Sequence, residues 1–129
     1  MRPNKDKYYL DIAAAVSRRS TCLRRQYGAV IVNNDEIIST GYNGSPRGEI
    51  NCCDRGTCFR EGCEHNDGNY GICCSVHAEM NCIISASRAE MIGGTLYLVG
   101  FENGQAIAAE PCPICRRLIK NAGIKEVIT

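Results

Sequence analysis

Two stretches of the sequence carry metal-binding side chains: Val76-His77-Ala78-Glu79-Met80-Asn81 and, further downstream, Pro111-Cys112-Pro113-Ile114-Cys115. Together the two stretches supply one imidazole, two thiolates and one carboxylate. An imidazole and two thiolates are three of the four ligands that zinc takes, and a catalytic zinc keeps its fourth position open for water. A carboxylate two residues from the histidine can carry protons between that water and a substrate. The pair of stretches therefore predicts a catalytic zinc site with Glu79 as its acid–base group.

Each half of this pattern is weak alone, because C-x-x-C also serves redox sites and structural zinc. The joint pattern is more specific: prolines flank Cys112, and both stretches are expected to open a helix, where the helix dipole favours thiolate over thiol. We therefore predict His77, Cys112 and Cys115 as the ligands of a catalytic zinc. The alternative is a structural zinc closed by a neighbouring cysteine.

Length and charge exclude several classes of protein. A chain of 129 residues fits one domain, residues 1–129, with a sizeable core. Its net charge of +1 gives no overall electrostatic case for binding nucleic acid. No apolar run reaches the ~20 residues of a membrane span, and the N-terminus lacks the apolar core of a signal peptide. We therefore expect a cytoplasmic protein without membrane contact, although the arginines at 18–19 and 24–25 could bind a phosphate.

The cysteine content needs a separate explanation. The chain has 10 cysteines, and without an export signal a metal accounts for them better than disulfides do. Residues 49–74 show almost no hydrophobic periodicity but contain six of these cysteines and His65. A loop of this length in a compact domain requires something to order it, and zinc can supply that folding energy. We predict an insertion at about 49–74 ordered by a second, structural zinc, with a flexible lid bearing incidental thiols as the alternative.

Hydrophobic patterning predicts the order helix, two strands, helix, strand, helix, strand. The expected elements are a helix at 5–19, a hairpin at 29–32 and 36–40, a helix from Ser75 to about 89, a strand at 95–99, a helix from Pro111 with Gly123 just past its end, and a strand at 124–129. Residues 101–110 read as a polar excursion. Crossovers of this type imply parallel later strands. The expected fold class is α/β, with a mixed, mostly parallel sheet of about four strands between helices.

The segment 41–48 follows the second strand, and its glycines and proline mark a loop with tight backbone demands. Asn43 lies in this loop. It is either a turn former whose hydrogen bonds are satisfied locally or, because it follows a strand beside the predicted zinc helix, a substrate contact.

These features resemble the cytidine deaminase superfamily and, within it, the deoxycytidylate (dCMP) deaminase family; the H-x-E and P-C-x-x-C pair is the established signature of zinc nucleobase deaminases. The resemblance covers nearly the whole chain. It is carried by residues 20–25, 28–32, 41–48, 51–52, 58–61, Cys73 and the two zinc motifs. The loop containing Asn43 and the cysteine-rich insertion indicate the dCMP branch. A three-layer α-β-α fold of the cytidine deaminase type is thereby implied.

The resemblance also implies roles for individual residues. Glu79 would move protons, the Ala78 backbone N–H would bind the base carbonyl, and Asn43 the sugar hydroxyl, with Ser45 and Arg47 as further substrate contacts. The implied ligands of the second zinc are Cys22, Cys52, Cys58 and Cys73, with Cys53, Cys63, Cys74 and His65 as alternatives.

The implied function is zinc-dependent hydrolysis of dCMP to dUMP and ammonia in pyrimidine nucleotide metabolism. The alternatives are a tRNA adenosine deaminase, which Glu110 before Pro111 echoes, a free (deoxy)cytidine deaminase, and a zinc-binding module without activity. Some family members respond to dCTP and dTTP. Members usually continue past the last strand seen here, which puts that regulation in doubt, and the exposed sheet edge predicts a homo-oligomer.

Overall fold

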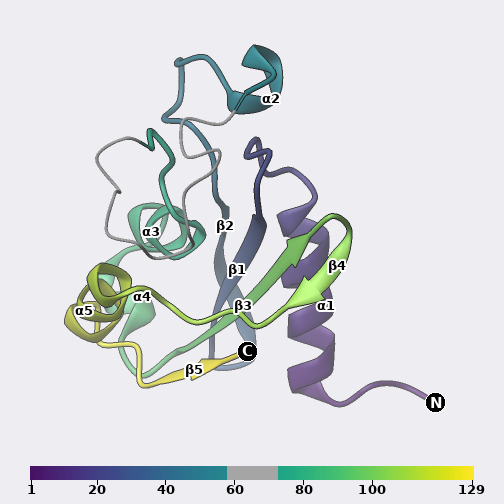
Figure 1. The fold of residues 1–129 in the computed structure, drawn as a ribbon. Helices are drawn as coiled ribbons and strands as arrows, with labels where there is room; N and C mark the ends of the chain where they lie inside the picture. Colours follow the sequence, from purple (N-terminus) through teal and green to yellow (C-terminus); the bar gives the residue numbers. More distant parts are fainter. Residues whose placement is uncertain (58–72) are drawn as a thin grey trace.

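A computed structural model describes residues 1–57 and 73–129 of the chain (Figure 1). The helices are α1 (Lys5–Ser17), α2 (Cys52–Arg55), α3 (Ala78–Ile84), α4 (Arg88–Met91) and α5 (Pro113–Asn121). The strands are β1 (Gln26–Asn33), β2 (Glu36–Tyr42), β3 (Thr95–Glu102), β4 (Gln105–Ile107) and β5 (Glu126–Ile128). None of the helices in these two ranges combines the length and apolar character needed to cross a lipid bilayer.

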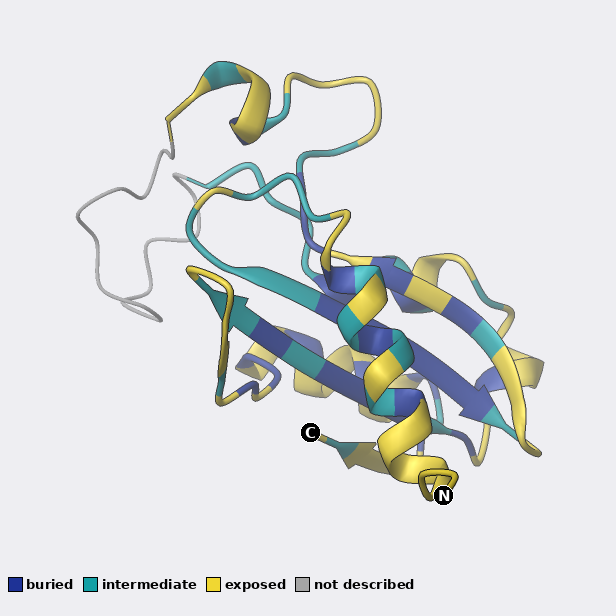
Figure 2. Ribbon diagram, turned by 90° about the vertical axis from the view of Figure 1, so that its right-hand side faces the viewer, coloured by how far each residue is buried: buried dark blue, intermediate teal, exposed yellow. Residues whose placement is uncertain are grey.

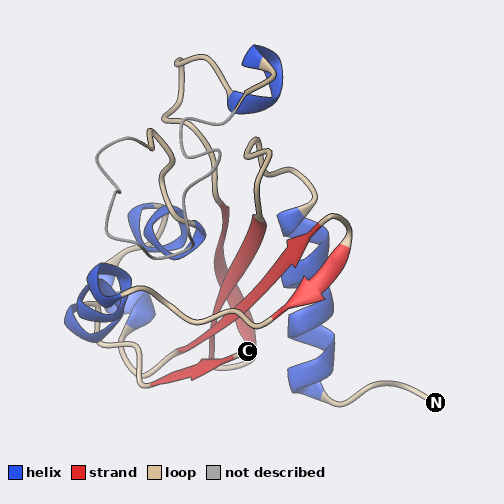
Figure 3. Cartoon of the chain, in the orientation of Figure 1, coloured by secondary structure: helices blue, strands red, loops and turns tan. Residues whose placement is uncertain are grey.

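The sheet lies between two layers of helices, as Figures 1 and 3 show. Helix α1 covers one face alone, and its Tyr9 and Ala13 pack on Val30 and Tyr97. Helices α3, α4 and α5 cover the other face over a second apolar cluster that includes Ile31, Leu96, Leu98 and Ile119. Strand β1 contributes to both clusters, and Figure 2 shows it buried along most of its length. The predicted α-β-α layering is confirmed.

The predicted strand pairing needs a correction. The sheet is mixed, but in the described part of the chain it has five strands, of which only β3 and β5 pair in parallel. Strand β1 pairs antiparallel with both β2 and β3. Strands β2 and β3 therefore run in the same direction, as a crossover through α3 requires, but β1 lies between them. The fifth strand is β4, which pairs with the end of β3 inside the expected polar excursion.

The helix carrying the H-x-E motif is shorter than the sequence predicts. Its N-cap is His77, not Ser75, because Val76 is extended and exchanges backbone hydrogen bonds with Gly44 at 3.1 and 2.7 Å. The helix ends at Ile84, and the separate helix α4 begins behind a capping box formed by Ser87 and Glu90. Gly123 follows α5 with a φ of 84°, as expected for the left-handed residue that ends a helix.

Helix α3 lies against β2 without a side chain between their backbones. A Cβ atom at Gly41 would lie 2.4 Å from the Ala78 carbonyl oxygen and 2.6 Å from the Cys82 nitrogen, so only glycine fits there. Two bonds reinforce this contact: the Ser39 hydroxyl donates to the Cys82 carbonyl at 2.8 Å, and the buried Cys82 thiol donates to the Ala29 carbonyl at 3.1 Å. Cys82 is therefore part of the core rather than a metal ligand.

Helix α1 is attached to the sheet by two tyrosine hydroxyl groups. Tyr9 donates to an Asp35 carboxylate oxygen at 2.6 Å, and Tyr97 of β3 donates to Asp6 at 2.8 Å. The bond between Tyr9 and Asp35 lowers the pKa of that carboxyl and, with burial, raises the pKa of Tyr9 to about 12. The contact is therefore formed by a neutral phenol and an ionised carboxylate.

Replacing Tyr9 with Phe should remove a pH-dependent part of the stability. The bond stabilises the fold fully between the unfolded pKa values of Asp and Tyr, roughly 4 and 10. Its contribution is lost as the pH falls through the lowered pKa of Asp35, and again as the pH rises towards the Tyr9 pKa of about 12. We expect the melting temperature of Tyr9→Phe to lie below wild type at neutral pH and the gap to narrow at both extremes. Thermal melts followed by circular dichroism measure this, with the exposed Tyr8→Phe as control. A gap that does not change with pH would assign the effect to packing alone.

Candidate metal centre

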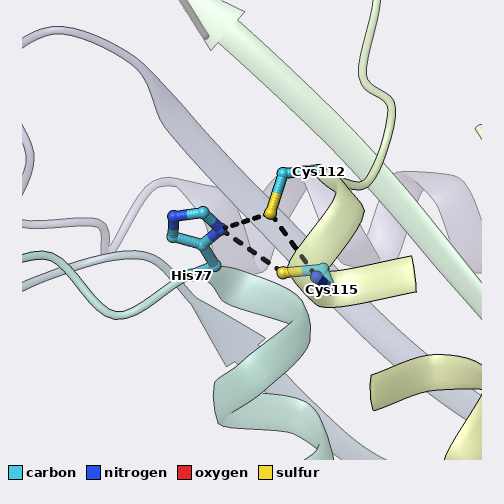
Figure 4. A group of neighbouring side chains, drawn as sticks. All are labelled: His77, Cys112 and Cys115. Carbon is cyan, nitrogen blue, oxygen red and sulfur yellow. Dashed lines mark hydrogen bonds between the residues drawn. The ribbon is translucent and has the colours of Figure 1, made fainter. Parts of the chain in front are cut away.

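The N-termini of α3 and α5 meet over the sheet, and each brings metal-binding side chains to the same point. His77 is the N-cap of α3, Cys112 is the N-cap of α5, and Cys115 lies one turn into α5. The Cys112 sulfur accepts the Cys115 backbone N–H at 3.5 Å, which fixes the turn between them. Figure 4 shows the three side chains pointing toward one another.

The spacing of the three ligand atoms suits a tetrahedral zinc. His77 Nδ1 lies 3.6 Å from Cys112 Sγ and 3.3 Å from Cys115 Sγ, and all three atoms lie within 4.8 Å of one another. Zn–S bonds of about 2.3 Å and Zn–N bonds of about 2.0–2.1 Å at tetrahedral angles separate sulfur and nitrogen ligands by roughly 3.6 Å. The predicted ligand set of His77, Cys112 and Cys115 therefore comes together with the geometry that the metal requires.

Charge in this cluster also fits a cation. Burial, the neighbouring Glu79 carboxyl and the Cys112 thiol together raise the pKa of Cys115 strongly. Two thiolates and a carboxylate gathered in a buried place repel one another, and a divalent cation between the sulfurs offsets that repulsion. His77 is half-buried whereas the two cysteines are buried, so the cluster is open to solvent on the histidine side.

Glu79 lies in the first turn of α3 with 5% of its surface exposed. Burial raises the pKa of its carboxyl, and His77 and Cys115 partly offset this increase. Its carboxyl group hydrogen bonds to the Cys115 side chain, so it borders the ligand cluster without being one of the three ligands. A buried carboxyl with a raised pKa beside an open metal position can both accept and release a proton.

The predicted substrate residues differ in how directly they are connected to this cluster. Gly44, next to Asn43, pairs with Val76, and Val76 precedes His77, so the loop containing Asn43 is joined directly to the metal-binding segment. Ala78 is fully buried at the first position of α3. Ser45 is half-buried, with its hydroxyl 3.5 Å from the Cys74 sulfur, and Arg47 is exposed. The substrate roles of these four residues remain predictions.

Asn43 is almost fully buried, and its side chain is bonded within the chain. Its Oδ1 accepts from Ser20 Oγ at 2.7 Å and from the Tyr27 backbone N–H at 2.8 Å, and its Nδ2 donates to the Arg25 carbonyl at 2.9 Å. The sequence indicated a turn former or a substrate contact, but not Ser20 or Tyr27 as partners. In the sequence, Ser20 is only one residue of the family motif at 20–25. No local pattern indicates that its hydroxyl bonds to the Asn43 side chain.

Arg24 and Arg25, the two arginines just before β1, lie in different surroundings. Arg25 Nε donates to Glu102 on β3 at 3.2 Å, and hydrogen bonds to Tyr27 and Glu102 raise the pKa of Arg25. The charge of Arg25 is therefore paired with a carboxylate at the end of β3. Arg24 is half-buried.

The described cysteines of the predicted second site lie near one another without closing a ligand set. The Cys22 thiol is 3.2 Å from Ser75 Oγ, and the Ser75 backbone N–H donates to Cys73 at 3.3 Å. Burial raises the pKa of Cys22 to about 11, with smaller contributions from Cys73 and Cys52. Within residues 1–57 and 73–129, His77, Cys112 and Cys115 are the one group of three metal-binding side chains that converge. Cys58, Cys63 and His65 lie outside the described residues.

A cavity of about 430 Å³ lies on the opposite face of the sheet, next to α1. Ser17, Arg18, Gln26 and Phe101 are among the residues that line it. None of the predicted catalytic, metal or substrate residues borders it. The chemistry of the chain is therefore not directed to this cavity.

Comparison with known proteins identifies the family. Residues 3–129 match the family model described as the cytidine and deoxycytidylate deaminase zinc-binding region. The chain is 37% identical over 133 residues to a deoxycytidylate deaminase of Mycobacterium phage D29, covering 98% of this chain and 94% of that protein. It is 36% identical to the deoxycytidylate deaminase of Schizosaccharomyces pombe, of which it covers 37%.

Solved structures agree with this match. A dCMP deaminase from cyanophage S-TIM5, in complex with dCMP and dUMP, superimposes with a TM-score of 0.69 at 29% identity, over 98% of this chain and 81% of that one. A cytidine deaminase from Burkholderia pseudomallei shares the fold, with a TM-score of 0.57 at 20% identity. The chain therefore belongs to the cytidine and deoxycytidylate deaminase family and is a deaminase, an enzyme of the hydrolase class.

Proposed function

We propose that the protein hydrolyses dCMP to dUMP and ammonia with zinc held by His77, Cys112 and Cys115. The observation that carries the proposal is the convergence of this ligand triad with buried Glu79, in a chain that matches deoxycytidylate deaminases over nearly its full length. Zinc in this position supplies Lewis-acid activation of water. The reaction belongs to pyrimidine nucleotide metabolism, and the abundance of thiols fits a reducing cytoplasm.

The protein residues divide the remaining work. The backbone N–H of Ala78 is among the first N–H groups of α3, which have no partner within the helix, so it is suited to bind the base carbonyl. Glu79 takes a proton from the attacking water and delivers it to N3 of the cytosine ring. It then passes the second proton to the amino group at C4. A C4–O bond forms, the C4–N bond breaks and ammonia leaves, so atoms and charge balance.

Replacing Glu79 with Gln tests this assignment. The amide keeps the size of the side chain but cannot accept a proton, and general acid–base catalysis contributes roughly 10²–10⁴-fold to a rate. We expect ammonia release to fall by at least about 100-fold, with zinc content and melting temperature close to wild type. Glu110→Gln, an exposed carboxylate just before the C-x-x-C motif, is the matched control and should retain activity. Retention of more than about a tenth of wild-type turnover by Glu79→Gln would contradict its role.

The nucleotide specificity is proposed to depend on cationic side chains near the loop that contains Asn43. The arginines assigned to the 5′-phosphate are Arg24, which belongs to the residues that carry the family resemblance, and Arg47, which is exposed in the loop after Asn43. Arginine binds phosphate through charge-assisted hydrogen bonds, each worth about 1.5–3 kcal/mol. These contacts are absent when the substrate is a free nucleoside.

A substrate panel of dCMP, CMP, dCTP, deoxycytidine and tRNA, assayed by ammonia release, measures this preference. We expect kcat/KM for dCMP to exceed that for deoxycytidine by about 10- to 100-fold or more, because only dCMP gains the phosphate contacts. Equal efficiency would move the assignment to a free-nucleoside deaminase. Activity confined to tRNA would move it to the adenosine deaminase branch.

A second zinc is proposed for the cysteine-rich insertion, with Cys22, Cys52 and Cys73 supported by their proximity and Cys58 by the family resemblance. The backbone of Cys53 donates to the Thr21 carbonyl at 3.1 Å, which joins α2 to the segment containing Cys22. A metal bound there would join α2 to the segments that contain Cys22 and Cys73. Its role would be structural, because none of these thiols belongs to the ligand group that Glu79 borders.

Metal analysis separates the two sites. We expect two zinc ions per chain in wild type, and one after either Cys112→Ala or Cys52→Ala. Loss of Cys112 should abolish activity with a modest decrease in melting temperature, whereas loss of Cys52 should mainly lower stability, because structural zinc contributes folding energy. Cys82→Ala is the control, because the thiol of this buried cysteine donates to the Ala29 carbonyl and binds no metal in this proposal. One zinc per chain in carefully prepared wild-type protein would contradict the second site.

Assembly into a homo-oligomer is also proposed. Ile84 on α3 and Ile114 and Leu118 on α5 are 76%, 45% and 38% exposed, on the two helices that carry the metal site. Covering such apolar side chains favours association. Response to dCTP and dTTP, known for some family members, remains a prediction for this chain.

A further inference from the structure

The side chain of Asn43 uses most of its hydrogen-bonding capacity within the protein. A carboxamide has one oxygen that accepts two bonds and one nitrogen that donates two. Here the oxygen receives the Tyr27 N–H and the Ser20 hydroxyl, and one N–H goes to the Arg25 carbonyl. The bonding partners fix which atom is oxygen, because the Tyr27 N–H can only donate and the Arg25 carbonyl can only accept. The second N–H has no acceptor among residues 1–57 and 73–129, so it is the part of Asn43 assigned to the sugar hydroxyl.

The partners of Asn43 lie in, or directly after, the stretch that carries Arg24. Ser20 and Arg25 bound the arginine segment (residues 20–25), and Tyr27 follows in β1. Ser20 Oγ also lies 2.8 Å from the Asn43 carbonyl, so its single hydrogen serves either of two acceptors on the same residue. At the other end, Glu102 holds the Arg25 guanidinium. Asn43 thus bonds to the residues at both ends of the segment that contains Arg24.

The other side of Asn43 leads to the metal ligands. The substrate loop (residues 43–47) continues from Asn43 to Gly44, whose two backbone bonds to Val76 fix the residue before His77. Thr21 of the arginine segment closes the same junction: its hydroxyl accepts the Ser45 N–H at 3.3 Å, and a Cβ at Gly44 would come within 2.4 Å of that oxygen. Asn43 is therefore the point at which the arginine segment, the substrate loop and the metal-binding segment are joined.

We propose that Asn43 is a positioning residue that sets the preference for a 5′-phosphorylated substrate by holding the arginine segment against the substrate loop. This role is additional to any contact with the sugar, and the two are separable. A lost sugar contact weakens dCMP and deoxycytidine alike, because both carry the same deoxyribose. A displaced arginine segment weakens only the substrate that has a phosphate. The inference rests on the proposed action on dCMP.

The test compares kcat/KM for dCMP and for deoxycytidine in wild type, Asn43→Ala and Ser20→Ala. We expect the ratio of the two constants to fall about tenfold in Asn43→Ala, the size of one lost charge-assisted contact. Ser20→Ala removes a partner of Asn43 without touching the amide, and should lower the ratio in the same direction by about threefold. It also keeps the test open if Asn43→Ala does not fold. Backbone hydrogen exchange at Tyr27 should become faster in Asn43→Ala, because its N–H loses the bond to Oδ1.

Asn33→Ala is the matched control. Its amide also donates to two carbonyl groups of another segment, those of Glu90 and Ile92, but at the opposite end of β1. We expect it to lower the melting temperature and leave the substrate ratio unchanged. A wild-type preference for dCMP that survives both Asn43→Ala and Ser20→Ala, with both substrates weakened equally, would overturn the positioning role and leave the proposed function intact. A wild type without preference for dCMP would instead overturn the phosphate assignment itself, and the specificity role with it.

Discussion

The structure depends on two helix N-termini meeting over one face of a sheet. His77 caps α3 and Cys112 caps α5, so both ligands lie where backbone N–H groups stabilise negative charge. The two helices are distant in sequence, and their packing on the sheet and on each other brings their N-termini together. The apolar cluster around Ile31, Leu96 and Leu98 is therefore as much a part of the metal site as the ligands are. Repulsion among the buried acidic groups is the energetic cost of this arrangement, and a cation at the centre offsets it.

The sequence predicts the residues of the metal site better than it predicts the sheet. His77, Cys112 and Cys115 stand in short motifs whose chemistry is local, and the structure brings them together. The order of strands is set by long-range contacts, and hydrophobic periodicity contains no information on which strands become neighbours. The expectation of a mostly parallel sheet failed for this reason: β2 and β3 run in the same direction, but β1 lies between them. The prediction of where α3 begins was wrong for a similar reason. Serine is a favourable N-cap residue, but pairing with Gly44 keeps Val76 extended, so the N-cap is His77 rather than Ser75.

Hydrogen bonds between side chains and distant segments were the hardest feature to predict from the sequence. Asparagine in a glycine-rich loop is consistent with a turn, a ligand or both, and only the positions of Ser20, Arg25 and Tyr27 show which of its atoms remain available. Cysteine is similarly ambiguous. The sequence alone does not distinguish Cys82 from the ligand cysteines, yet its thiol donates a hydrogen bond to the Ala29 carbonyl of β1 inside the core. Arg25 carries the charge expected of a phosphate ligand, but Glu102 on a distant strand pairs with it.

The contact between Gly41 and α3 has a consequence for sequence change in this fold. A hydrogen atom is all that separates the β2 backbone from the Ala78 carbonyl and the Cys82 nitrogen. Any larger side chain would push the helix, and with it His77 and Glu79, away from the sheet on which α5 also packs through Ile119 and Ala122. The distance between α3 and the sheet is therefore set by the absence of a Cβ atom at Gly41. A designed or natural variant that replaces Gly41 and still binds metal must also have shortened or rebuilt the first two turns of α3.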